Sequence, residues 1–160
     1  MNTHSIQTTS LARIWIPLGA AVFLLALAVS AWAVPALRPL HVLQGLLYAA
    51  VVILAFRGST WGLGAGFTVA VAWNSLNLFV THLMQAGMVE MWSFLHTGHV
   101  QRPDTMMVPV GGVGHFVLLG ACLAAAVQQP AGRSKWWKFA GGGALSIAYM
   151  ALIIALALPS

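Results

Sequence analysis

Five long apolar segments alternate with short polar stretches along the chain. They cover residues 11–34, 39–56, 61–87, 108–129 and 139–158. Each approaches the roughly 20 residues that a helix needs to cross the hydrocarbon core of a bilayer. The pattern therefore predicts an all-α integral membrane protein, a bundle of five transmembrane helices in which residues 1–160 form a single domain.

The composition supports a membrane location. Hydrophobic residues make up 60% of the chain and charged residues only 6%, whereas a soluble domain carries about 25% charged residues. No water-soluble catalytic domain fits between the segments. The net charge of +5 is spread over short loops, so it indicates membrane topology and no nucleic-acid partner. The single cysteine, Cys122, excludes an internal disulfide.

The basic residues predict which end of the bundle faces the cytoplasm. Five of them fall on the side of the N-terminus: Arg13, Arg57, Arg133, Lys135 and Lys138. The other end has two, Arg38 and Arg102, together with the acidic Glu90 and Asp104. By the positive-inside rule we expect the N-terminus inside and the C-terminus outside, in a bacterial-type inner membrane that the chain crosses several times.

The first segment has a second interpretation. A basic residue, an apolar run and the stretch "AVSAWAVPA" resemble a signal peptide that is cleaved after Ala31-x-Ala33. Cleavage would leave four helices with the same sidedness.

The histidines gather at one depth under this topology. Five of the six lie on or just beneath the predicted outer face: His41, His82, His96, His99 and His115. Ionisable side chains within a span are costly and face the bundle interior, and imidazole binds copper, zinc, iron and haem. The cluster predicts a metal or haem site. Alternatively, each ring lies among lipid headgroups or hydrogen-bonds a neighbouring helix.

Two cofactors suit these residues. His82 and His115 are the most deeply embedded pair and are the candidate axial ligands of haem b, with His41 as a substitute. The glycines at 111, 112 and 114 would let a flat porphyrin, or equally a neighbouring helix, approach His115. Five of the seven methionines fall between residues 84 and 107, and thioether with imidazole favours copper. A bundle without any cofactor is the remaining alternative.

Polar side chains follow one face of the third segment. Asn74, Asn77 and Gln85 recur at helical spacing beside His82, and Gln44 of the second segment is able to join them. Such a stripe faces protein or a cavity. It is predicted either to orient a ligand imidazole or to form a hydrogen-bonded helix interface.

The loop "MVEMWSFLHTGHVQRPDTMM" after the third segment has an amphipathic pattern of its own. One face presents Met88, Met91, Trp92, Leu95 and then His99. The spacing predicts a short helix lying on the membrane surface and ending near Gly98, which would cover a site in the bundle.

Together these features predict a small inner-membrane subunit with a histidine-rich metal or haem site at its outer face. It would serve electron transfer or metal delivery in a larger membrane oxidoreductase complex, so we expect other membrane subunits as partners beside the lipid bilayer. One alternative is a structural accessory subunit without a cofactor. Another is a small membrane enzyme that acts on a lipid or a quinone, with His82 or His115 as acid or base.

Overall fold

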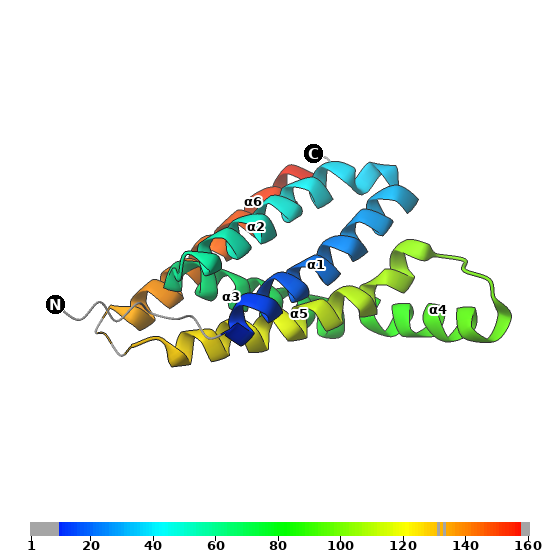
Figure 1. Cartoon of the computed structure of the whole chain (residues 1–160). Coiled ribbons are helices and arrows are strands. Elements are labelled where there is room, and N and C mark those ends of the chain that lie inside the picture. Colours follow the sequence, from blue (N-terminus) through cyan, green and yellow to red (C-terminus); the bar gives the residue numbers. More distant parts are fainter. Residues whose placement is uncertain (1–9, 131, 133, 158–160) are drawn as a thin grey trace.

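The computed structural model describes residues 10–130, 132 and 134–157, and within them every regular element is helical (Figure 1). The elements are α1 (Ser10–Ala33), η1 (Pro35–Leu37), α2 (Arg38–Phe56), α3 (Thr60–Ser75), η2 (Leu76–Val80), α4 (Leu83–Thr97), α5 (Pro103–Gln128) and α6 (Lys135–Ala157). The all-α prediction is confirmed. Arg133, which was used to predict the orientation, lies outside the described residues.

Five of these stretches are long and apolar enough to cross a membrane, as predicted. They are Arg13–Ala33, Pro35–Phe56, Thr60–Val80, Pro103–Gln128 and Lys135–Leu156. The second span begins earlier than expected because Pro35 and Pro39 occupy first-turn positions of η1 and α2, where a missing N–H costs nothing. The fourth span begins at Pro103 for the same reason. The negative charge of Asp104 in its first turn interacts favourably with the positive end of the helix dipole.

The third span ends earlier than predicted, at Val80 and not at residue 87. Its last turn is a π-helix, in which the Thr81 amide donates to the Leu76 carbonyl at 2.9 Å. His82 then adopts a left-handed conformation with φ of 54°. The side-chain amide nitrogen of Gln85 donates a hydrogen bond to the Leu78 carbonyl in this turn, at 2.9 Å. The polar stripe that periodicity predicted is therefore interrupted after Asn77.

The helix predicted after the third span is present as α4, but it begins at Leu83. It ends at Thr97, and Gly98 caps it with the expected left-handed φ of 70°. Its first half packs on α5, where Gly87 lies against Thr105 and Pro109, and its second half extends beyond the bundle (Figure 1). That α4 lies on a membrane surface stays a prediction.

α5 lies at the centre of the packing, against α1, α3 and α4, while α3 also contacts α6. Glycines bring these helices close together. A Cβ on Gly19 of α1 would meet the Leu118 amide nitrogen at 2.7 Å. The glycines around His115 face Phe23 of α1 and Met84 of α4, so they accommodate neighbouring helices and not an open porphyrin slot. The buried core runs along α1, α2, α3 and α5.

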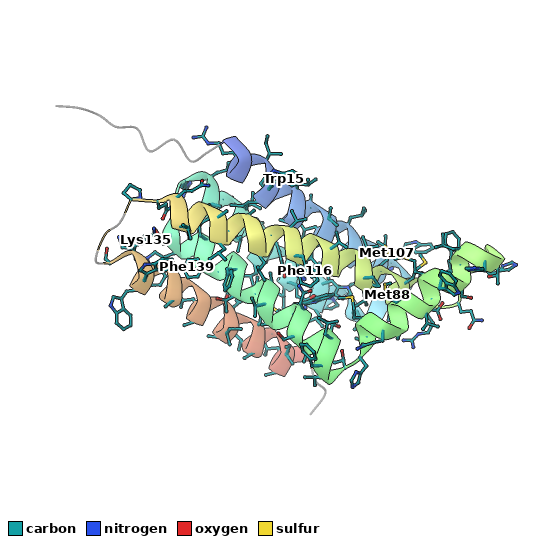
Figure 2. The ribbon with its side chains drawn as sticks, turned by 90° about the horizontal axis from the view of Figure 1, so that it is seen from below. Trp15, Met88, Met107, Phe116, Lys135 and Phe139 are labelled. Atoms are coloured by element: carbon teal, nitrogen blue, oxygen red, sulfur yellow. The ribbon has the colours of Figure 1, made fainter. Side chains whose placement is uncertain are left out.

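The connections between successive spans lie alternately at the two ends of the bundle (Figure 1). The α1–α2 connection and α4 share one end, called the α4 end below, with Met88 and Met107 (Figures 1 and 2). The opposite end, called the basic end, holds the start of α6 at Lys135 and Phe139 (Figure 2). This alternation is what successive membrane crossings require.

Candidate polar cavity at the α4 end

The structure separates the five candidate histidines. His82, His96 and His99 are exposed, His41 is half-buried and His115 is completely buried. His96 hydrogen-bonds within its own helix to the Trp92 carbonyl at 2.9 Å and stacks on the Trp92 ring. Among the described residues, no three His, Cys, Asp or Glu side chains lie close enough to hold a metal ion.

The exposed His82 occupies a backbone position that suits glycine. Its left-handed φ costs an L-residue about 1–2 kcal/mol, and it is the described chain's only positive-φ residue other than glycine. We expect His82→Gly to retain or raise stability, because glycine lacks this cost. We expect His82→Val to lower stability by about 1 kcal/mol, because a β-branched residue tolerates a left-handed backbone less well than histidine does. Thermal unfolding in detergent measures both, with His99→Val as the exposed control. Equal losses in His82→Gly and His82→Val would show that the imidazole itself matters.

A cavity of about 170 Å³ lies at the α4 end, between α1, α2, α5 and the junction of α3 with α4. It is partly open to the surface of the molecule. Its polar lining includes His41, Gln44, Asn77, Asp104 and Thr105. The structure therefore brings together His41, Gln44 and Asn77 from the predicted set, and leaves His82, Gln85 and Met88 exposed and outside the lining.

Two buried polar atoms that belong to residues of the cavity lining have no partner within the described chain. They are Nδ1 of His41 and Oε1 of Gln44, both buried from solvent. Asn77 is better satisfied, because its amide nitrogen donates to the Trp73 carbonyl at 2.9 Å. A buried polar atom without a hydrogen bond costs about 1–3 kcal/mol, so these two atoms require partners that the described chain does not supply.

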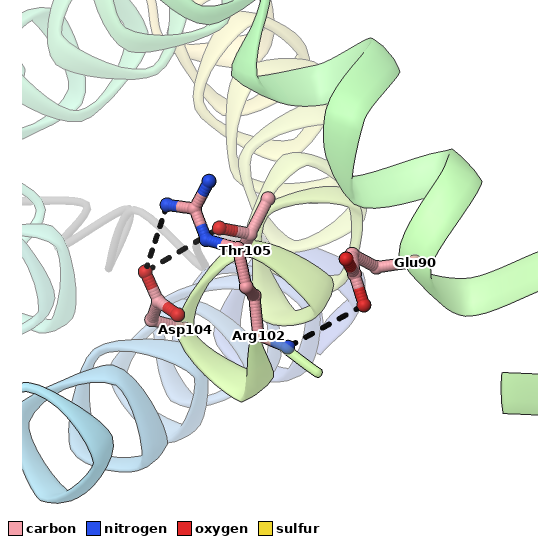
Figure 3. A network of polar contacts seen from close by, with 4 residues as sticks. All are labelled: Glu90, Arg102, Asp104 and Thr105. Carbon is pink, nitrogen blue, oxygen red and sulfur yellow. Dashed lines mark hydrogen bonds and ion pairs between the residues drawn. The ribbon is translucent and has the colours of Figure 1, made fainter. Parts of the chain in front are cut away.

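The rim of the cavity carries a carboxylate held in place by its neighbours. Asp104 accepts a hydrogen bond from Thr105 Oγ1 at 3.4 Å and pairs with the Arg102 guanidinium at 3.7 Å (Figure 3). The Arg102 amide donates to Glu90 of α4 at 3.4 Å, which ties the loop to that helix. Asp104 thus contributes a carboxylate to the cavity lining, with Arg102 as its ion-pair partner and Glu90 bound to the Arg102 amide.

An aromatic layer closes the cavity from below. Phe23 and Trp73 line the cavity and also pack on the His115 ring, with centroids 4.0 Å and 4.6 Å away. The Tyr48 hydroxyl and His115 Nε2 share a hydrogen bond. His115 Nδ1 and both amide atoms of Asn74 are buried without a partner in the described chain. A second polar layer, fully buried within the bundle, thus lies next to the cavity.

This arrangement does not fit a haem. The Nε2 of His115 is engaged by Tyr48, and Phe23 and Trp73 pack on its ring. The proposed axial partner, His82, is exposed. At about 170 Å³, the cavity is also too small for the four-pyrrole ring of a porphyrin. Copper has no better support, because Met88 is exposed and Met91 only partly buried. Haem and copper stay predictions from the sequence that this geometry does not support.

Sequence reasoning missed Tyr48, Trp73, Asp104 and Thr105. Tyr48 continues the helical face of His41 and Gln44 at steps of three and four, so its position could have been predicted from the sequence. Asp104 and Thr105 were placed in a loop because the fourth span was expected to begin at residue 108, whereas α5 begins at Pro103.

Comparison of the chain with protein-family models, curated proteins and solved structures finds no match.

Proposed function

We propose that this multi-pass membrane protein binds the headgroup of a quinone in the polar cavity at the α4 end, as a small subunit of a larger membrane assembly. The observation that carries the proposal is the pair of buried, unpartnered polar atoms at the cavity, His41 Nδ1 and Gln44 Oε1. A quinone carbonyl accepts a hydrogen bond, and the reduced quinol hydroxyl donates one. An imidazole and an amide are able to serve both forms.

The shape and charge of the cavity favour a quinone over a phospholipid headgroup. Phe23 and Trp73 offer aromatic surface to a flat ring. The carboxylate of Asp104 at the rim would repel a phosphate and leaves a neutral ring unaffected. A volume of about 170 Å³ suits a single ring, and the apolar tail of a quinone would leave the cavity through its open side.

Water is the simplest competing occupant. The cavity, of about 170 Å³, is large enough for several waters. Water would satisfy the same polar atoms, so the two occupants have to be separated by a binding experiment.

Trp73 provides the readout, since its indole lines the cavity and quinones quench indole fluorescence. In a titration of the detergent-solubilised protein with a short-chain ubiquinone, we expect saturable quenching that Trp73→Phe removes. His41→Ala and Gln44→Leu each lose one hydrogen bond and should weaken binding about 3- to 10-fold. His99→Ala and Gln85→Leu, both exposed and outside the cavity lining, should bind like wild type. Linear quenching that is the same in Trp73→Phe would leave water as the occupant.

A further inference from the structure

A second pocket lies at the basic end, where five spans begin or end. Its volume is about 370 Å³. Four basic side chains from three parts of the bundle line it: Arg13 of α1, Arg57 after α2, and Lys135 and Lys138 of α6. Arg13, Arg57 and Lys138 are exposed and Lys135 is half-buried, so the pocket is accessible from outside.

Hydrogen bonds across the pocket hold its walls together. Thr60 Oγ1 donates to Oε1 of Gln129 at 2.7 Å, and Gln129 Nε2 donates to the Gly58 carbonyl at 2.9 Å. Lys135 Nζ donates to the Gln129 carbonyl at 2.8 Å. Gln129 thus joins the end of α5 to the α2–α3 turn and to α6, and this fixes the relative positions of the basic groups.

The acidic side chains of the chain lie elsewhere. There are two, Glu90 and Asp104, and both interact with Arg102 at the α4 end (Figure 3). The positive-inside rule accounts for basic residues at this end of the bundle. The rule does not require that four basic residues line one pocket. Their repulsion is relieved most directly by an anion in the pocket.

We propose that this pocket binds the phosphate of an anionic membrane phospholipid. Lysine and arginine bind phosphate through charge-assisted hydrogen bonds, and basic pockets between membrane helices suit anionic headgroups. The pocket lies at headgroup depth, because exposed tryptophans surround the same end, as interfacial tryptophans do. These are Trp15, Trp61, Trp136 and Trp137.

An apolar groove supports a lipid over a free phosphate. The groove, of about 680 Å³, runs between α2, α3 and α6. Leu54 and Trp61 line it, and they are close in the chain to Arg57 and Thr60 of the basic pocket. An acyl chain in the groove would lie next to a headgroup held by the basic residues.

The test is an equilibrium titration of the full chain in phosphatidylcholine-containing mixed micelles with fluorescent phosphatidylglycerol. We expect saturable binding that the double variant Arg57→Gln/Lys138→Gln weakens about 30-fold, since each basic group contributes roughly a fivefold gain in affinity. The double variant Arg38→Gln/Arg102→Gln removes the same charge at the α4 end and should bind like wild type. Arg57→Lys/Lys138→Arg should also retain binding, which separates loss of charge from loss of folding.

Three results would overturn the proposal. The first is equal binding by wild type and Arg57→Gln/Lys138→Gln. The second is equal binding of labelled phosphatidylcholine. The third is competition by inorganic phosphate at the concentration where unlabelled phosphatidylglycerol competes, which would assign the pocket to a free phosphate.

Discussion

Gly64→Ala should cost the protein about 3 kcal/mol of stability or prevent its folding. A Cβ at Gly64 of α3 would lie 2.7 Å from the carbonyl carbon of Phe139 in α6 and 2.9 Å from its Cα. The obstacle is backbone, so no side chain is able to rotate away. The two helices would have to separate, which would also disturb Gly142, whose own Cβ would meet the Trp61 backbone at 2.8 Å.

Gly120→Ala is the matched control for this prediction. Gly120 lies within α5, is exposed, and has no heavy atom within 4 Å of its would-be Cβ. The same added methyl should be neutral there, or stabilise by about 0.5–1 kcal/mol through helix propensity. Thermal unfolding in detergent, with size-exclusion chromatography as a check of folding, compares the two. Equal stabilities would contradict the close contact between α3 and α6.

Tyr48→Phe should destabilise the protein by about 1–3 kcal/mol, although it removes a single oxygen. His115 Nε2 would lose its hydrogen-bond partner, and its Nδ1 already has none within the described chain. The His115 ring, packed against Phe23 and Trp73, would then be a buried imidazole without any protein hydrogen bond. Unfolding with a denaturing detergent measures the loss.

The double variant Tyr48→Phe/His115→Leu shows whether the hydrogen bond causes this loss. Removing both polar partners avoids the unsatisfied group, so the double variant should be at least about 1 kcal/mol more stable than the sum of the single effects predicts. Tyr149→Phe is the control, since the half-buried Tyr149 hydroxyl donates to the Leu43 carbonyl and strands no imidazole. Additive effects of the two changes would contradict a shared, buried hydrogen bond.

The spans could be predicted from the sequence because the bilayer imposes a length on every crossing helix. A run of about 20 apolar residues is a local property that needs no knowledge of packing. The end of the third span depends on something less local. The segment has no charged residue before Glu90, so hydropathy alone does not show the π-helical turn or the left-handed His82 that end the span.

The candidate site was predicted in part for the same reason. His41 and Gln44 share one uninterrupted face of α2, and Asn77 precedes the break at residue 81, so periodicity predicted their positions and the structure places all three at one cavity. His82 and Gln85 lie after the break at residue 81, where the change in backbone direction cancels the periodicity. His96 lies in the half of α4 that extends beyond the bundle, and His99 follows it (Figure 1). These histidines are close in the sequence and in predicted depth, but the structure does not gather them at one site.

Photochemical labelling tests the quinone proposal most directly. The protein would be irradiated with an azido-ubiquinone in detergent, with and without excess short-chain ubiquinone, and the labelled peptides mapped by mass spectrometry. The predicted result is label on the cavity residues of α1, α2 and α5, near Phe23, His41 and Thr105, which the competitor suppresses. Label spread over the exposed lipid-facing side chains, and unaffected by the competitor, would contradict a quinone site in this cavity.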